Sequence, residues 1–254
     1  MEEAKIELWK KAAEKGSFFD DFKEKSPYWS WRTDNYAGFE LENGVLKMYT
    51  GPTEALYYSN AEIADGSFEY LPWSFKTFEA KIRLIGGHYG SAGWGFWNYT
   101  MVVDPCIPIW FIYLRSRGPY PLQGFFAQVG NQFEPIILFQ KSTAFKLASL
   151  LSRIIPGAIG VKILSSKPKM QNLKLEEWHI YRIEWKKESV NFHIDDTKVA
   201  EIPYKAGEVK TRADVWIDNA VFEAKKNDAG RVYRHVTQEN RKRGYLYLDY
   251  LKVY

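Results

Sequence analysis

The chain has 254 residues, with 35 Lys or Arg, 31 Asp or Glu and a formal net charge of +4. Because the two signs are interspersed along most of the sequence, this balance predicts a mixed, soluble surface and no nucleic-acid partner. The single cysteine, Cys106, excludes an intramolecular disulfide. No run reaches the roughly 18 uninterrupted apolar residues of a transmembrane segment.

The length and the aromatic content narrow the class of protein further. No linker rich in Gly, Ser or Pro divides the chain, so residues 1–254 are predicted to form one domain. Aromatic residues make up 17% of the chain, including 10 Trp and 17 Tyr. Trp and Tyr favour positions where one edge stays in contact with water. We therefore expect part of this aromatic content to line a ligand surface.

The first predicted element is a helix over residues 2–15, within an N-terminal segment 1–16 that ends at Gly16. Ile6, Trp9 and Ala13 share one face of it, and we expect that face to pack against the outside of the main fold. The start of the chain is charged and lacks the apolar core of a signal peptide. The sequence therefore predicts a cytoplasmic protein.

From Phe18 onward, short runs of alternating apolar character recur between Gly, Asn, Asp and Pro residues. Examples are residues 44–49, 77–84 and 182–185, with a turn predicted at Glu42-Asn43-Gly44. Many short antiparallel strands at this spacing predict an all-β protein with two packed sheets.

The stretch 133–170 departs from this pattern and is predicted to be a hydrophobic insertion. It contains a helix near 142–155, whose apolar positions recur at intervals of three and four: Ala144, Leu147, Ala148, Leu151, Ile154 and Ile155. Long apolar insertions of this kind often act as lids or binding loops. Four roles stay open: packing over one end of the sheets, covering a ligand site, contacting another subunit in a homo-oligomer, or lying on a membrane surface, which the small number of basic residues disfavours.

A basic cluster lies before the last predicted strand and comprises Arg231, Arg234, His235, Arg241, Lys242 and Arg243. Such a cluster can contact phosphates, but the charge balance of the chain favours a solvated loop.

Four segments together resemble a known family. They are Gly93-Trp94-Gly95-Phe96-Trp97-Asn98, the hairpin-like segment 178–196, Val215-Trp216-Ile217-Asp218-Asn219 and the C-terminal 247–254. Their order and spacing are similar to those of the concanavalin A-like glucanases of glycoside hydrolase family 16, the laminarinase and lichenase type. The resemblance covers roughly residues 17–254, with an interruption near 133–170. It implies a concanavalin A-like jelly-roll sandwich of two antiparallel sheets.

The resemblance fails at the residues that carry the chemistry. The glucanases place E-x-D-x-E on one strand, so that the acids share a face in the cleft. The corresponding segment here is 108–116, and no Asp or Glu occurs between Ile107 and Gly118. The sequence therefore favours a protein that does not hydrolyse glycans, and no catalytic residue is assigned. Displaced carboxylates at Asp104, Glu134 or Asp218 keep a glycosidase with relocated acids as an alternative.

The resemblance and strand alternation give the candidate ligand-binding residues. Because both faces of 93–98 stay open, Trp94, Trp97 and Asn98 are all candidates. On 108–116 the polar groups of Tyr113 and Arg115 favour their side of the strand as the ligand face. The full set is Trp94, Trp97, Asn98, Tyr113, Arg115, Gln128, Trp216, Asp218 and Asn219.

The predicted function is carbohydrate binding by a non-hydrolytic relative of these glucanases, with an oligosaccharide or polysaccharide as the partner. A second alternative is an apolar small molecule held under a lid formed by 135–164. No cofactor is required, although the resemblance implies a structural calcium ion at Asp249.

Overall fold

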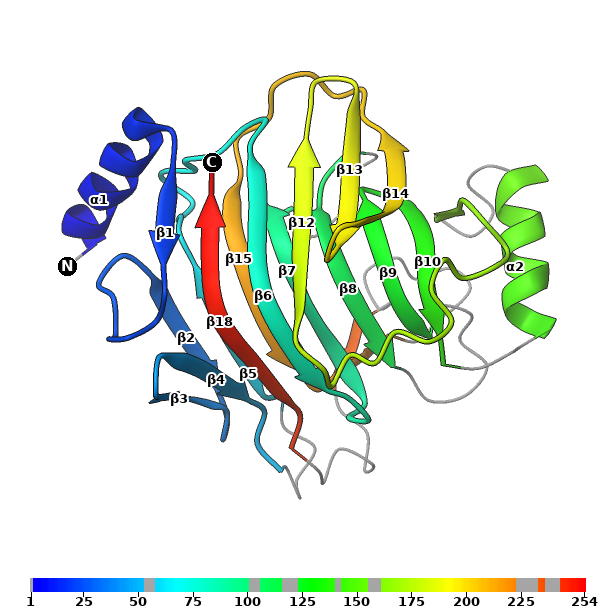
Figure 1. Ribbon diagram of the computed structural model, residues 1–254, viewed down its shortest axis with the longest axis horizontal. Helices are drawn as coiled ribbons and strands as arrows, with labels where there is room; N and C mark the ends of the chain where they lie inside the picture. Colours follow the sequence, from blue (N-terminus) through cyan, green and yellow to red (C-terminus); the bar gives the residue numbers. More distant parts are fainter. Residues whose placement is uncertain are drawn as a thin grey trace.

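The computed structural model describes residues 2–52, 58–100, 106–115, 123–139, 143–154, 161–222, 233–235 and 243–254. Two curved sheets pack face to face. Helices α1 (Glu2–Lys15) and α2 (Thr143–Ile154) lie at opposite ends of the molecule (Figure 1). Candidate Asp104 lies outside the described residues, as do Arg231, Arg241 and Lys242 of the predicted basic cluster.

The sheet that we name sheet A has eight strands and contains the C-terminal strand near its centre. Its order is β14 (Thr197–Pro203), β13 (Ser189–Ile194), β12 (His179–Trp185), β6 (Thr77–Ile85), β18 (Tyr245–Val253), β4 (Val45–Tyr49) and β3 (Gly38–Glu42), with β1 (Phe18–Asp20) also paired to β18.

Sheet B also has eight strands, and only its edge pair β10–β11 is parallel. Its order is β11 (Lys162–Ile163), β10 (Gln132–Leu138), β9 (Gly124–Val129), β8 (Ile109–Arg115), β7 (Gly90–Trp97), β15 (Arg212–Asp218), β5 (Asn60–Ala64) and β2 (Ser30–Asp34). A separate hairpin pairs β16 (Ala220–Phe222) with β17 (Tyr233–His235).

The main core lies between the two sheets, because each strand points alternate side chains inward. Aromatic rings from both sheets meet there. The ring centroid of Trp94 lies 4.7 Å from that of Tyr181, and Phe111 lies 5.1 Å from Phe192. Burying one such side chain contributes roughly 1.5–3 kcal/mol. This core therefore holds sheet A on sheet B and fixes which residues of sheet B face outward.

Two local predictions from the sequence are confirmed. The N-terminal helix runs from Glu2 to Lys15 and packs through Trp9, whose indole N–H donates to the Tyr28 carbonyl at 2.8 Å. The turn between β3 and β4 has positive φ at Asn43 (55°) and Gly44 (75°). Asn and Gly tolerate this left-handed conformation, which a two-residue hairpin turn of this type requires.

The predicted insertion is only partly an insertion. Its first residues form β10, a regular strand of sheet B, and β11 returns to pair beside it. The helix is confirmed, but the side that packs coincides only in part with the predicted apolar stripe, with which it shares Ala148. Phe145, Ala148, Ser149 and Ser152 are buried, whereas Leu147 and Leu151 are 56% and 36% exposed. Ile155 lies outside the described residues.

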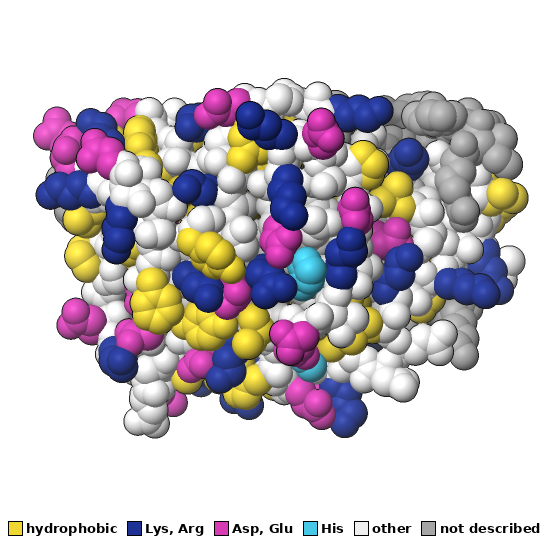
Figure 2. All heavy atoms as spheres, turned by 45° about the horizontal axis from the view of Figure 1, so that its top comes forward, with side chains coloured by type: hydrophobic (Ala, Val, Ile, Leu, Met, Phe, Trp, Pro, Cys, Tyr) yellow, Lys and Arg dark blue, Asp and Glu magenta, His cyan; other side chains and the backbone are white. Residues whose placement is uncertain are grey.

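The outward side of sheet A carries aromatic and charged side chains in mixture. Figure 2 looks onto this side and shows basic and acidic groups interspersed with apolar ones. Arg83, for example, lies 4.2 Å from the Tyr247 ring and 5.2 Å from the Trp178 ring. Among the described residues, no helix is both long and apolar enough to cross a membrane.

Candidate functional site

Strand β8 shows which side chains reach the outer face of sheet B, the face directed away from sheet A. Ile109, Phe111 and Tyr113 belong to the core between the sheets. By alternation, Trp110, Ile112 and Leu114 point to the outer face. No carboxylate stands on either side of this strand, and the three outward positions carry an indole and two aliphatic side chains.

The predicted ligand face of β8 was therefore wrong. Tyr113 is 1% exposed and lies between the sheets. Its hydroxyl donates to the His88 carbonyl at 2.9 Å and accepts from the Gly87 N–H at 3.2 Å, so its burial leaves no polar atom unpaired. Arg115 lies at the strand end, 5.0 Å from the Tyr89 ring. Trp94 is likewise a core residue.

Helix α2 covers the part of the outer face formed by β8, β9 and β10. Its Phe145 and Ala148 pack in one apolar cluster with side chains of these strands and of β11: Ile112, Leu114, Phe126, Phe133 and Ile163. The space between the described residues of α2 and these strands is thus occupied by the protein's own side chains, while residues 140–142 and 155–160 of the predicted lid lie outside the described residues. What α2 leaves uncovered begins at Trp110 and Trp216, which border this cluster and are partly exposed, and continues over β7, β15, β5 and β2.

Three indoles form the floor of this uncovered part, and we name Trp97, Trp110 and Trp216 the indole floor. The ring centroids of Trp110 and Trp216 lie 4.4 Å apart, and those of Trp97 and Trp110 lie 6.2 Å apart. All three residues are partly exposed. The predicted candidates Trp97 and Trp216 are thus brought together by the fold, and Trp110, which was not predicted, lies between them.

Glycines of β7 make room for these rings. The register pairs Gly93 with Trp216 and Gly95 with Trp110. A Cβ atom at Gly93 would collide with the Trp216 ring, and one at Gly95 would lie 2.7 Å from the Trp110 Cβ. Glycine inside a strand often marks such a close approach. The G-W-G-F-W pattern therefore places Trp94 in the core while leaving the opposite side of β7 flat enough to carry indoles.

Each indole N–H of the floor is already used within the protein. Trp97 donates to the Thr100 carbonyl at 3.0 Å, Trp110 to Gln128 Oε1 at 2.7 Å and Trp216 to Ser91 Oγ at 3.0 Å. These bonds fix the orientation of the rings. What the floor offers a ligand is consequently its ring faces.

The predicted polar contacts mostly position other groups. Gln128 holds Trp110 and donates through Nε2 to the Gly130 carbonyl at 2.6 Å. Asp218 accepts from the Ser91 N–H and Oγ, at 3.1 and 2.8 Å, and so orients the hydroxyl that holds Trp216. Asn219 Oδ1 accepts from the Ser59 N–H at 2.8 Å. Asn98 Oδ1 accepts from the Thr100 N–H at 3.2 Å.

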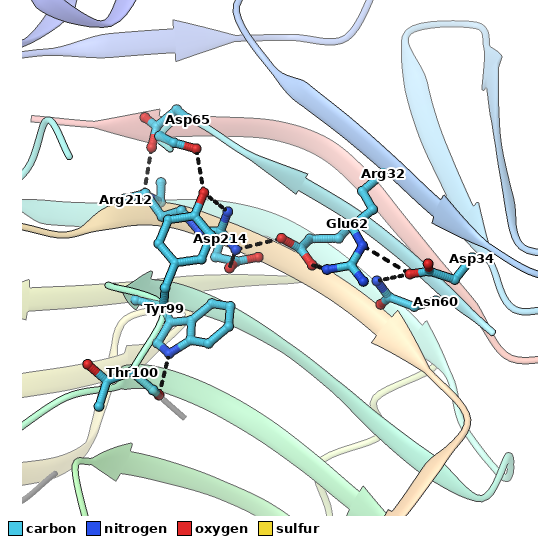
Figure 3. A network of polar contacts seen from close by, with 12 residues as sticks. Arg32, Asp34, Asn60, Glu62, Asp65, Tyr99, Thr100, Arg212 and Asp214 are labelled. Atoms are coloured by element: carbon cyan, nitrogen blue, oxygen red, sulfur yellow. Dashed lines mark hydrogen bonds and ion pairs between the residues drawn. The ribbon is translucent and has the colours of Figure 1, made fainter. Parts of the chain in front are cut away.

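A charged network adjoins the indole floor on β15, β5 and β2 (Figure 3). Arg212 Nη2 donates to Glu62 Oε1 at 2.5 Å and to Asp214 Oδ2 at 2.7 Å. Arg32 continues the network outward, since its Nε lies 3.0 Å from Asp34 Oδ2 and its Nη1 lies 3.9 Å from Glu62 Oε2. The side chains of Arg212 and Asp214 are 4% and 2% exposed, whereas that of Arg32 is 60% exposed. The network thus runs from the interior to the surface.

The buried end of the network is electrostatically unusual. Burial raises the pKa of Asp214, against the opposing pull of the Arg212 guanidinium. The nearby carboxylates raise the pKa of Arg212, so this guanidinium stays charged. Among the described residues, three shielded atoms of this network have no hydrogen-bond partner: Asn60 Oδ1, Arg212 Nε and Asp214 Oδ1. Such atoms are costly to leave unpaired.

Aromatic rings connect the network with the indole floor. The Arg212 guanidinium carbon lies 5.0 Å from the Trp97 ring and 3.9 Å from the Tyr99 ring. The Tyr99 hydroxyl accepts from Arg212 Nη1 at 2.6 Å and donates to the Gly66 carbonyl at 2.8 Å. Charged groups and ring faces therefore meet on one surface, which is the arrangement that a sugar requires.

Sequence reasoning missed the network because its members lie on three separate strands. Arg212 and Asp214 alternate on β15, but Glu62 and Asn60 precede them by some 150 residues, on β5. A signal was present in R-A-D-V-W-I-D, in which every second residue is polar or aromatic and the residues between are apolar. That pattern predicts a half-buried strand with a polar side.

Of the predicted displaced acids, Glu134 and Asp218 do not come together, and Asp104 lies outside the described residues. Glu134 lies on β10, where it contacts Ser165 and Lys169, and Asp218 lies on β15. Three strands separate β10 from β15. At about 4.8 Å per strand, the two carboxylates belong to strands roughly 19 Å apart. The two carboxylates are therefore too far apart to act on one glycosidic bond.

Asp249 lies on the outward side of sheet A. Its Oδ2 is 2.8 Å from Lys81 Nζ. Within the described ranges no group of three or more His, Cys, Asp or Glu side chains is placed to hold a metal ion. An ammonium beside the carboxylate fits a bound calcium ion poorly, because calcium takes six to eight oxygen ligands. The calcium site stays a prediction.

No protein family model and no curated protein matches this sequence. Solved structures do match. The laminarinase from Flavobacterium sp. UMI-01 is similar with a TM-score of 0.56 and 14% identity, over 93% of this chain and 98% of that one. A family 16 glycosyl hydrolase from Mycobacterium smegmatis gives 0.52 and 13%, over 93% and 99%. The kappa-carrageenase from Pseudoalteromonas carrageenovora, in complex with an oligotetrasaccharide of kappa-carrageenan, gives 0.53 and 10%, over 92% of each chain.

At these identities the likeness concerns the fold. The paired sheets, the helices and the near-complete coverage of both chains agree with the prediction made from the four sequence segments. This chain has the concanavalin A-like jelly-roll fold of family 16 glycan-active enzymes.

Proposed function

We propose that this protein binds an oligosaccharide or polysaccharide without cleaving it, on the outer face of sheet B. The observation that carries the proposal is the indole floor, where three partly exposed rings have their N–H groups satisfied internally and lie beside charged side chains. Sugars present flat C–H faces that stack on indoles and hydroxyls that bond to charged and polar groups. Solved structures of the same fold include an enzyme bound to an oligosaccharide, which supports this class of ligand.

The non-hydrolytic part of the proposal rests on β8. Hydrolysis with retention needs two carboxyls about 5 Å apart on either side of the glycosidic bond. The outward side chains of β8 are Trp110, Ile112 and Leu114, and two of them lie in the apolar cluster under α2. Strand β8 therefore supplies no carboxyl group for the reaction, and the positions of Ile112 and Leu114 are not accessible to a substrate.

The test is a tryptophan-fluorescence titration with β-glucan, xylan and galactan oligosaccharides. We expect one series to give a saturable change. Trp110→Ala should weaken binding of that series about tenfold, since a stacked ring contributes about 1 kcal/mol beyond the area that it buries. Trp178→Ala is the matched control, because Trp178 is also partly exposed but lies over Arg83 of sheet A. Equal weakening by both variants, or no response to any series, would contradict the proposal.

One observation favours a second candidate, a glycosidase with relocated acids. Glu62 and Asp214 both bond Arg212 Nη2, so their nearest oxygens lie no more than about 5 Å apart, the separation typical of retaining enzymes. The raised pKa of Asp214 suits a general acid.

This candidate predicts release of reducing ends from the bound series, and loss of that release in Glu62→Gln. Binding without cleavage predicts that neither the wild type nor Glu62→Gln releases reducing ends. Assaying the wild type with the series that binds best decides between the two hypotheses. Glu201→Gln controls for the loss of a carboxylate elsewhere, because the Glu201 side chain on β14 is 56% exposed.

A further inference from the structure

We infer that the ligand surface continues beyond sheet B to Phe68 and the pocket behind it, so that the ligand is an extended polysaccharide chain. This inference rests on the proposed function. It adds a second contact region that neither the sequence nor the fold assigns.

A row of rings leads from the indole floor to this region. The successive centroid distances are 4.4 Å from Trp216 to Trp110, 6.2 Å from Trp110 to Trp97, 5.5 Å from Trp97 to Tyr99 and 4.0 Å from Tyr99 to Phe68. The first four members are partly buried, but Phe68 is 84% exposed. The row therefore reaches the surface at Phe68.

A pocket of about 500 Å³ begins at the same residue. It lies between α1 and the segment that joins β5 to β6. Its lining is Ala13, Phe68, Glu69, Tyr70, Leu71, Pro72, Ser74, Lys76 and Lys210. Aromatic and proline surfaces thus stand beside a hydroxyl, a carboxylate and ammonium groups, which is the mixture that sugar rings and their hydroxyls require.

The pocket also offers polar contacts. Lys76 Nζ donates to the Gly16 carbonyl at 2.8 Å, and Lys210 Nζ lies 3.0 Å from Glu208 Oε1. Because an ammonium group has three N–H donors, each of these groups keeps donors that a sugar hydroxyl can accept from.

The position of α2 gives the direction of the chain. This helix covers β8, β9 and β10, so a ligand on the indole floor meets a wall of apolar side chains on that side. Away from α2, the row of rings leads over β7 toward Tyr99 and Phe68. A single exposed Phe is common on protein surfaces. Here it ends the row of rings and also lines the pocket, and both facts point to a contact with the same ligand.

The experiment is a calorimetric titration of the wild type, Phe68→Ala and Phe19→Ala with one neutral β-glucan, xylan or galactan series, from tetrasaccharide to decasaccharide. In the wild type, affinity should rise with length as the second region is reached, because linked contacts add. Phe68→Ala should lose about tenfold in affinity for the decasaccharide and leave the tetrasaccharide unchanged. Phe19, which is 59% exposed on β1, should behave as the wild type when replaced.

The outcomes separate this inference from the proposed function. If Phe68→Ala keeps the gain with length, or weakens tetrasaccharide and decasaccharide equally, the second region is overturned while binding at the indole floor stands. If no series binds the wild type, the proposed function and this inference both fail.

Discussion

At the scale of single residues, the polar groups that looked like ligand contacts proved to hold other side chains in place. Gln128 and Asp218 were predicted because amides and carboxylates bind sugar hydroxyls. In the structure their oxygens are taken by Trp110 and by Ser91, respectively. A sequence shows that a polar residue lies on a strand, but not whether its partners are already inside the protein. The prediction of the rings was mixed. Trp97 and Trp216 lie on the indole floor, whereas Trp94 and Tyr113 belong to the core and Trp110 was missed.

Histidine 88 gives a prediction on pH at the same scale. It is buried, it stacks on Tyr113 with ring centroids 5.0 Å apart, and burial lowers its pKa to about 4. The folded state therefore disfavours the protonated ring, whose pKa in the unfolded chain is near 6.5. The contribution of His88 to stability is fully present above pH 6.5 and is lost as the pH falls through about 4. That loss amounts to roughly 3 kcal/mol.

Buried carboxyls act in the opposite sense within the same pH window. Burial raises the pKa of Asp65 to about 7, so its contribution is present at low pH and is lost as the pH rises. The test therefore compares urea unfolding of the wild type and His88→Gln at each pH between 4 and 7. The unfolding free energy of the wild type minus that of His88→Gln should fall steadily as the pH is lowered toward 4. A difference independent of pH would show that His88 is not buried in its neutral form.

At the scale of elements, the strands and helices were largely predictable, because alternation and helical spacing are local properties. The ends of β10 and the side of α2 that packs against the sheet could not be predicted. A helix with apolar residues on more than one side offers two ways to pack, and which one is used depends on the neighbouring strands. Here β8 presents Ile112 and Leu114, β9 presents Phe126, and Phe145 is the side chain of α2 that meets them.

This packing predicts a difference between two residues of α2. Phe145→Ala should lower the free energy of unfolding by about 3 kcal/mol, the usual cost of truncating a buried Phe. Leu147→Ala should change it by less than about 0.5 kcal/mol, because this side chain is 56% exposed. Urea denaturation of both variants checks the pair. A larger loss at Leu147 than at Phe145 would mean that the helix packs through its other side.

At the scale of the whole molecule, the fold followed from sequence segments whose order matched a known pattern, whereas the site did not. Glu62 and Arg212 form one ion pair from strands far apart in the chain. Only the pairing of β5 with β15 brings them together. The absence of acids on β8 could be predicted from the sequence. The position of α2 against the outer face of this strand could be determined only from the structure.

The central claim is that the outer face of sheet B binds a glycan without cleaving it. Saturation-transfer NMR of the protein with the oligosaccharide series that binds best tests both parts in one sample. We expect saturation on the C–H protons of the sugar face that stacks on the indoles, and anomeric signals that do not change over hours. New reducing-end signals would show hydrolysis, and an absence of saturation with every series would show that this face does not bind glycans.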